Sequence, residues 1–295
     1  MMIKTIGVVI LNYKSYKDTE SLVKDLISQK TEHNIVIQIV DNASPNESYE
    51  YLSTNLKDIP SVFVTANDDN SGYARGNNLG LRLLAKHSPD YALVINNDIR
   101  FDISILNRLI ELSESIENVG AIAPVQYFPN GEADKQRLAI PTFWDDVTAY
   151  TYIFPKMRST QLALKENTHY KGVQQVGIVP GSFTFIDYKL FESVGFFSED
   201  TFLFCEERFL ARKLRNIGRL NYIALDCGFV HHHSKTINSE IQIMRQFRLL
   251  HDGRVAYTKC FRSYPKLKVA ILNMMFFYQY TRIKTIKAVK RFLKR

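Results

Sequence analysis

The stretch Tyr91–Asp98, with the sequence YALVINND, decides the fold of this 295-residue chain. It begins with an unbroken apolar run, which is typical of a strand buried on both faces of a parallel sheet. It ends in three polar residues, Asn96, Asn97 and Asp98. Because ligands of open α/β sheets bind beyond the carboxyl ends of the strands, a site is to be sought at this end.

Three earlier stretches have the same apolar character and alternate with stretches of helical periodicity. Strands are predicted at Ile6–Asn12, Ile35–Asp41 and Ser61–Thr65. Helices are expected from an N-cap at Asp18 or Thr19, after Gly76 and after Asp102. Such alternation predicts an α/β sheet with crossover helices.

From about residue 120 to residue 171 the pattern loosens, and prolines and aromatic residues predict a long, partly irregular segment. No functional role is assigned to its aromatic residues Trp144, Tyr150 and Tyr152. Regular structure is expected again as a strand pair or bent strand at Val176–Ile186, helices at Tyr188–Val194 and about Glu207–Ile217, and a last strand at Asn221–Phe229.

The net charge of +8 is concentrated in the C-terminal tail. After Asp252 there are 12 Lys or Arg residues and no acid, whereas 26 basic residues face 30 acids before that point. This asymmetry indicates a partner specific to the tail and argues against general nucleic-acid binding. The three cysteines are scattered, and no signal peptide or spanning helix is expected, so a cytoplasmic protein is predicted.

The tail also shows an amphipathic pattern. Its apolar positions recur at helical spacing, at Ile283, Ile286, Val289, Phe292 and Leu293. Lys and Arg fill most of the remaining positions, which predicts a helix lying on a membrane surface. The alternative is a C-terminal helix that packs on the body and exposes its lysines.

Polar residues follow three of the predicted strands. They are Asn12-Tyr13, Asp41-Asn42-Ala43-Ser44 and Asn96-Asn97-Asp98. If the carboxyl ends of these strands lie along one edge of the sheet, a shared rim, the polar residues come together there as a site. The alternative is that Asp and Asn end these strands simply as turn formers.

A glycine-containing stretch, Asn70–Gly80, is expected to open the second helix. Its glycines allow close backbone approach, and a helix N-terminus with Arg75 nearby suits a diphosphate. It is not a Walker loop, because no Gly-Lys-Ser/Thr follows, and it is not a dinucleotide fingerprint, because Gly72, Gly76 and Gly80 are wrongly spaced.

Taken in order, these pieces resemble the family 2 glycosyltransferases, in particular the rhamnosyltransferase-like branch of bacterial polysaccharide synthesis. The likeness runs over roughly residues 5 to 240. It is carried by Val9–Tyr13, Val40–Ser44, Asn70–Gly80, Ile95–Asp98, Gly181–Phe183, Val194–Phe197, Phe202–Glu207, Arg212, Gly218 and His231–Thr236.

The resemblance implies a GT-A fold: a mixed, mostly parallel central sheet flanked by helices, followed by a helical, basic tail. It implies a nucleotide-sugar-binding half at residues 1–120, an acceptor-binding and catalytic half at 121–240, and a membrane-associating segment at 241–295. The donor-binding residues would be Asn12, Tyr13, Asp41, Asn42, Asn70, Gly72, Arg75, Asn78, Asn97 and Asp98.

The resemblance also implies individual roles. Asp41 would bind the nucleobase, Asp98 would be the last residue of a metal-binding Asp-x-Asp, and His231 would lie near the metal or diphosphate. In the pair Glu206-Glu207, the second carboxylate would be the general base, although Glu206 is a rival and N-terminal acids also suit a helix dipole.

Two residues depart from the family pattern. Asn96 replaces the first acid of the metal motif, and Glu207 stands where the family usually has Asp. A Mg²⁺ or Mn²⁺ cofactor is still expected, because such ions need only one or two carboxylates plus phosphates.

The expected activity is inverting transfer of a sugar from a nucleotide diphosphate to a glycan or lipid-diphosphate-linked acceptor. The tail would contact the inner face of the cell membrane. A non-catalytic sugar- or nucleotide-binding module is the alternative, and a nucleotidyltransferase is disfavoured because no glycine-rich basic loop follows the first strand. The sugar, the acceptor and the oligomeric state stay open.

Overall fold

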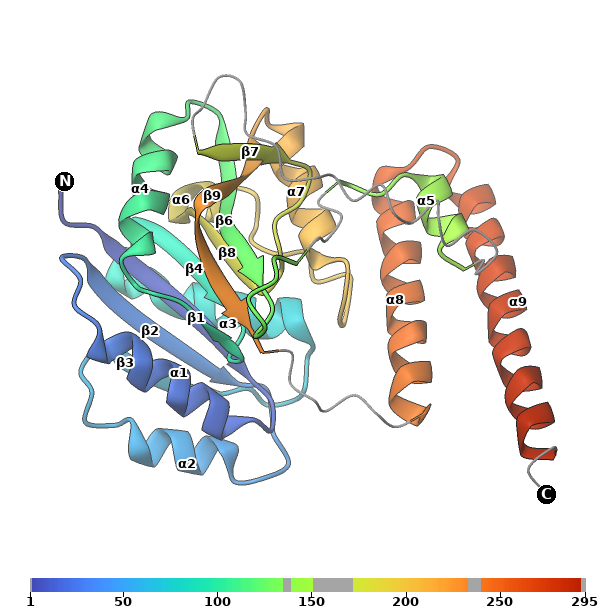
Figure 1. The fold of residues 1–295 in the computed structure, drawn as a ribbon, viewed down its shortest axis with the longest axis horizontal. Helices are drawn as coiled ribbons and strands as arrows, with labels where there is room; N and C mark the ends of the chain where they lie inside the picture. The colour runs from blue at the N-terminus through green and yellow to red at the C-terminus, as the bar shows by residue number, and fades with distance from the viewer. Residues whose placement is uncertain (1, 135–138, 151–171, 233–239, 293–295) are drawn as a thin grey trace.

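A computed structural model describes residues 2–134, 139–150, 172–232 and 240–292 (Figure 1). The first part alternates strands and helices: β1 (Thr5–Asn12), α1 (Tyr16–Ser28), β2 (Asn34–Asp41), α2 (Ser48–Asn55), β3 (Val62–Ala66), α3 (Tyr73–Leu84), η1 (Ala85–His87), β4 (Tyr91–Ile95), β5 (Ile99–Arg100) and α4 (Ile105–Ser115). Strand β1 pairs in parallel with β2 and β4, and β2 pairs in parallel with β3.

The second part adds β6 (Val119–Tyr127), α5 (Phe143–Thr148), β7 (Val173–Val176), β8 (Phe183–Asp187), α6 (Tyr188–Ser193), α7 (Glu206–Asn216), β9 (Leu220–His231), α8 (Glu240–Phe261) and α9 (Pro265–Phe292). The strand order is β3-β2-β1-β4-β8-β6-β9-β5, and β7 pairs with β9. Antiparallel β8 joins the parallel N-terminal strands to β6 and β9. The predicted α/β class with a mixed sheet and C-terminal helices is confirmed.

The core lies between the sheet and the helices that cover it. All of β4 is buried, as the unbroken apolar run Tyr91–Ile95 predicts. Helix α3 packs on β1 and β2, whereas α4 packs on β6, β8 and β9. The apolar positions predicted to face inward from α4 are all buried: Ile105, Leu106, Leu109 and Ile110.

Strand β6 was not expected, because Val119–Tyr127 falls in the stretch predicted to be irregular. A proline cannot donate a ladder hydrogen bond, and Pro124 therefore obscures the strand pattern. The structure accommodates it at a break in register, since the pairing of β6 with β9 shifts between Pro124 and Val125. Such a bulge relieves the ladder locally without ending the strand.

Two helix starts also differ from the prediction. Helix α1 begins at Tyr16 after Ser15, earlier than the predicted N-cap at Asp18 or Thr19. Helix α3 begins at Tyr73, so Gly76 lies inside the helix. A Cβ at Gly76 would come within 2.4 Å of Leu11 Cδ1, and this glycine therefore allows close packing of α3 on β1.

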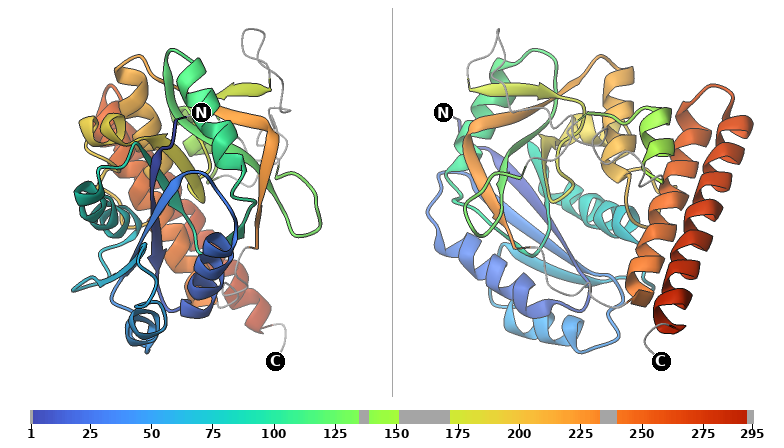
Figure 2. Two further views of the ribbon diagram at one scale, coloured as in Figure 1. Left: turned by 90° about the vertical axis from the view of Figure 1, so that its left-hand side faces the viewer. Right: turned by 45° about the vertical axis from the view of Figure 1, so that its right-hand side comes forward.

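The two C-terminal helices form an antiparallel pair beside the sheet domain (Figures 1 and 2). Helix α8 packs on α9 and on α7, and α5 packs on α9. Within the described ranges, no helix has both the length and the apolar character needed to span a bilayer.

Candidate active site

Hydrogen bonds connect the three polar strand ends. Asn12 Nδ2 donates to Asp41 Oδ2 at 2.7 Å, which joins the ends of β1 and β2. Thr19 Oγ1 donates to Asn12 Oδ1, and Asn97 Nδ2 donates to Thr19 Oγ1, each at 2.8 Å. The three exits therefore share one rim, as the sequence predicts.

The carboxylate of Asp41 is turned toward the protein. It is 1% exposed and also accepts hydrogen bonds from the backbone N–H and the hydroxyl of Ser44, at 2.9 and 2.8 Å. In this arrangement Asp41 holds the end of β2 in place. Its contact with a nucleobase stays a prediction, as does that of Tyr13, which is 41% exposed on the same rim.

Amide side chains brace the loop before α3. Asn42 Nδ2 donates to Asn70 Oδ1 at 2.9 Å and to the carbonyl of Gly72 at 3.3 Å. Asn67 Nδ2 donates back to Asn42 Oδ1 at 3.0 Å. Asn42 is 3% exposed, so this set shapes the loop from within.

The N-terminus of α3, where a diphosphate contact stays a prediction, lies against the chain at Phe202. Its first backbone N–H, from Tyr73, donates to the carbonyl of Phe202 at 2.8 Å. Gly72 has a φ of 86°, and a Cβ there would come within 2.2 Å of Phe202 O. The backbone at Phe202 thus covers the helix end that the sequence assigned to a phosphate.

Two residues of the Asn70–Gly80 stretch have structural partners instead. Asn78 is 1% exposed, and both ends of its amide are hydrogen-bonded. Its Nδ2 donates to the carbonyl of Phe197 and, at 2.9 Å, to Glu199 Oε1, whereas its Oδ1 accepts from the backbone N–H of Phe197. Arg75 lies on the exposed side of α3, with Nε 3.7 Å from Glu199 Oε2. The polar atoms of Asn78 thus hold the segment before Phe202, and its contact with the donor stays a prediction.

Asp98 and His231 meet where the sheet curls. Strand β5 pairs with β9 so that Ile99 faces His231 in the ladder. This register places His231 Nε2 3.1 Å from Asp98 Oδ1. The backbone N–H of His232 donates to the Asp98 carbonyl at 2.8 Å, whereas the His232 side chain is exposed and His233 lies outside the described residues.

A cavity of about 260 Å³ opens beside this pair. It is lined by Tyr73, Asn96, Gln126, Pro180, Gly181, Ser182, Phe197, Leu203, Phe204, Glu206, Glu207 and His231. The cavity therefore brings together the end of β4, the end of β9 and the first turn of α7, which are far apart in the sequence.

The two carboxylates at the start of α7 have different surroundings. Glu206 is 4% exposed and accepts a hydrogen bond from Thr201 Oγ1 at 3.2 Å. Burial, and next the charge of Glu207, raise the pKa of Glu206 to about 7. Glu207 is less buried and lines the same cavity. An accessible carboxylate next to one that resists ionisation is an arrangement suited to proton transfer.

Two polar residues of the cavity were not predicted from the sequence. Tyr73 Oη donates to the carbonyl of Gly181 at 2.6 Å, and burial raises its pKa. Gln126 Oε1 accepts a hydrogen bond from Ser182 Oγ at 2.9 Å. Gln126 was missed because it belongs to the unpredicted strand β6, and Tyr73 because it was placed in a loop.

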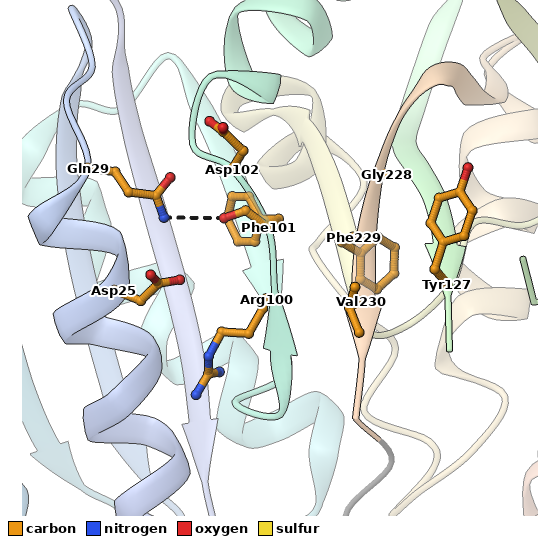
Figure 3. Close-up of a pocket in the computed structure, with 9 residues that line it drawn as sticks. All are labelled: Asp25, Gln29, Arg100, Phe101, Asp102, Tyr127, Gly228, Phe229 and Val230. Atoms are coloured by element: carbon orange, nitrogen blue, oxygen red, sulfur yellow. Dashed lines mark hydrogen bonds between the residues drawn. The ribbon is translucent and has the colours of Figure 1, made fainter. Parts of the chain in front are cut away.

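A larger hollow of about 510 Å³ lies between α1 and the region where β5 and β9 diverge (Figure 3). Two of its polar side chains have partners within the fold: Gln29 Nε2 donates to Phe101 O at 3.3 Å, as Figure 3 shows, and Arg100 Nη2 donates to Ser21 Oγ at 2.7 Å. None of the predicted site residues lines it. We therefore place the site in the smaller cavity.

Asp98 and His231 fit as two ligands of one divalent cation. Mg²⁺ binds oxygen at about 2.0–2.1 Å in an octahedron, so neighbouring ligand atoms lie about 3 Å apart. The 3.1 Å between Asp98 Oδ1 and His231 Nε2 agrees with this spacing. Across the described part of the chain, no set of three or more His, Cys, Asp or Glu side chains converges, so donor phosphates would have to supply further ligands.

A family model described as glycosyl transferase family 2 matches residues 7–194. The low-salt glycan biosynthesis hexosyltransferase Agl10 of Haloferax volcanii is 26% identical over 227 residues, which make up 75% of this chain and 66% of that protein.

Solved structures share the fold at low sequence identity. The mannosyltransferase PcManGT from Pyrobaculum calidifontis, in complex with GDP-Man and Mn²⁺, has a TM-score of 0.59 at 12% identity, covering 98% of this chain and 81% of that one. GalNAc-T7 with UDP, GalNAc and Mn²⁺ has a TM-score of 0.63 at 13% identity, covering 90% and 49%. Staphylococcus aureus TarS 1–349 has a TM-score of 0.53 at 13% identity, covering 94% and 71%.

Proposed function

This chain belongs to glycosyl transferase family 2, and from that premise we propose that it is an inverting hexosyltransferase. Its donor would be a nucleotide diphosphate sugar, either dTDP-rhamnose or a UDP-hexose. Its acceptor would be a hydroxyl of a glycan or of a lipid-linked oligosaccharide in cell-surface polysaccharide synthesis.

The observation that carries the proposal is the cavity shared by His231 and the Glu206-Glu207 pair. A sugar hydroxyl is a weak nucleophile, so a carboxylate must accept its proton as the new bond forms. Glu207 is the base in this proposal, because it is the more exposed of the two carboxylates and lines the cavity, whereas Glu206 is buried. The acceptor oxygen attacks the anomeric carbon from the side opposite the leaving diphosphate, which inverts the configuration.

Asp98 and His231 would hold a divalent cation against the donor diphosphate. When bound, this ion would offset the negative charge that develops on the leaving group. The named structural relatives PcManGT and GalNAc-T7 contain Mn²⁺, which supports a cation of this kind. Asn96 lines the cavity as a neutral neighbour, in place of the first acid of the family's metal motif.

The donor nucleotide would lie along the rim formed by the ends of β1, β2 and β4. Tyr13 is the accessible residue there, while Asn12, Asp41 and Asn97 keep the rim in shape through their hydrogen bonds. Arg75 would contribute through its charge from the outer side of α3, where it is 58% exposed.

We assign the exposed face of α9 to the inner surface of the cell membrane. Large apolar side chains recur there at helical spacing: Leu267, Met274 and Phe277 are 64%, 62% and 68% exposed. Ile286 and Val289, two of the apolar positions predicted in the tail, are 45% and 51% exposed. With no acid after Asp252, this surface suits an anionic lipid layer.

A donor panel tests the proposed activity. Purified protein would be incubated with UDP-, dTDP- and GDP-sugars, with and without Mn²⁺ and with acceptor mixtures, and released nucleotide diphosphate would be measured. Turnover of one donor class that depends on Glu207 is the expected result. Binding of a nucleotide sugar without any turnover would instead establish a non-catalytic binding module.

A further inference from the structure

The turn that presents Glu206 and Glu207 has an unfavourable backbone. Phe204 and Cys205 have φ values of 76° and 75°, in the left-handed region that residues with a Cβ rarely adopt. Two such residues in succession persist only where the surrounding structure holds them. Cys205, at the N-cap of α7, is 1% exposed, so the support comes from packed neighbours.

Helix α8 supplies part of that support. Gly253 lies so close that a Cβ on it would come within 2.9 Å of Phe204 O and 3.0 Å of Cys205 Sγ. One turn further along α8, the ring of Tyr257 packs edge-on against Phe209 of α7, with 5.4 Å between centroids. Helix α8, which belongs to the segment predicted to associate with the membrane, therefore also packs against the turn that carries Glu206 and Glu207.

A buried carboxylate ties the same elements together. Asp146 of α5 is 1% exposed and accepts a hydrogen bond from Arg208 Nη1 of α7 at 2.9 Å. Arg262, which directly follows α8, donates from Nη2 to the other Asp146 oxygen at 2.7 Å, and Arg254 Nε of α8 lies 3.3 Å from Oδ1. Asp146 is thus the common partner of three cations, one on α7, one on α8 and one just after α8.

Burial makes this carboxylate costly to lose. The side chains of Arg208, Arg254 and Arg262 are 12%, 7% and 8% exposed. Buried cations are tolerated when they are paired, and removing the shared anion leaves uncompensated charge that drives the side chains apart. Without the Asp146 carboxylate, the side chain of Arg208 would therefore lose its partner.

Arg208 follows directly after Glu207 in the first turn of α7. Successive residues of a helix are fixed in direction relative to one another, so anchoring Arg208 also sets the direction of Glu207. We infer that Asp146 is a positioning residue, which aims Glu207 into the cavity through Arg208 and through the contact of α8 with the turn. This inference rests on the proposed function.

The test compares Asp146→Asn with Asp226→Asn in the full-length protein. Asp226 pairs with Arg108 at 2.8 Å, away from the cavity, and is a matched carboxylate-to-amide control. Released nucleotide diphosphate is measured against donor concentration, using the donor that the panel identifies, and far-UV circular dichroism reports folding. Displacement of a reacting group by about 1 Å can cost on the order of 100-fold in rate.

For folded Asp146→Asn we expect kcat to fall at least tenfold, with donor KM within about threefold of wild type, and Asp226→Asn to behave as wild type. A lowered melting temperature with unchanged kcat would show a purely structural role and overturn the inference. Should Asp146→Asn not fold, Arg208→Lys keeps the charge but changes the contact, and unchanged kcat in that variant would equally overturn it. A wild-type protein that turns over no donor would overturn the proposed function, and this inference with it.

Discussion

Replacing Glu206 with Gln separates the two carboxylates that the sequence left as rival bases. The amide has nearly the same shape, and its oxygen can still accept the hydrogen bond from Thr201. The variant therefore removes a charge from a site that is 4% exposed without opening a cavity.

The magnitude follows from the raised pKa of Glu206, about 7 in the fold against an ordinary 4.5. The stabilisation from the neutral carboxyl is fully present below pH 4.5 and is lost as the pH rises through 7, because the unfolded chain ionises first. At about 1.4 kcal/mol per pKa unit, the ionised group costs the folded state about 3 kcal/mol at pH 8. Most of this cost, about 2–3 kcal/mol, develops between pH 5 and pH 8.

Urea unfolding, followed by far-UV circular dichroism at several pH values, measures this effect. Relative to wild type, Glu206→Gln should gain about 2–3 kcal/mol in free energy of unfolding between pH 5 and pH 8. In donor turnover at pH 8, the variant should stay within about tenfold of wild type, because Glu207 still accepts the proton. If the free energies of unfolding of wild type and Glu206→Gln changed with pH in parallel, burial would not raise the pKa of Glu206. A loss of turnover on the order of 1,000-fold would make Glu206 the base.

Three further perturbations test other parts of the account. Asp98→Ala should lower turnover by about 100-fold or more without unfolding the protein, and unchanged turnover across a Mn²⁺ titration would contradict its role at the diphosphate. Asn78→Ala should lower the free energy of unfolding by about 1–3 kcal/mol, because it leaves buried partners unsatisfied, and a raised donor KM with unchanged stability would place it in the donor site. Leu267→Glu combined with Phe277→Glu should abolish sedimentation with phosphatidylglycerol vesicles, whereas Ile27→Glu on α1 should not. Equal sedimentation of the double variant and of Ile27→Glu would contradict the assignment of the exposed face of α9 to the membrane.

The sheet was predictable where its strands are buried on both faces. The runs before Asn12 and Asn96 are apolar, the run before Asp41 is interrupted only by Gln38, and each became a strand within a residue or two of its predicted ends. Strand β6 was missed because Pro124 contradicts strand propensity, and only its pairing with β9, at a shift in register, makes room for it.

The candidate site was predictable in its chemistry more than in its geometry. The rim residues and the Asp98–His231 pair were brought together by strand order, which a sequence of motifs can anticipate. The surroundings of the N-terminus of α3 could not be anticipated in this way. The segment that covers it, at Phe202, lies more than 100 residues away in the sequence. The partners of Asp146 lie at positions 208, 254 and 262, and such a long-range charge cluster leaves no periodic signal in the sequence.

The central claim is that Glu207 removes the proton from the acceptor hydroxyl. The most direct measurement is kcat of Glu207→Gln, with its proper donor and acceptor, in protein shown to be folded by circular dichroism. The account predicts a fall of about 100-fold to 10,000-fold, with donor KM little changed, because general-base catalysis contributes that much. A Glu207→Gln variant that transfers sugar at nearly the wild-type rate would contradict it.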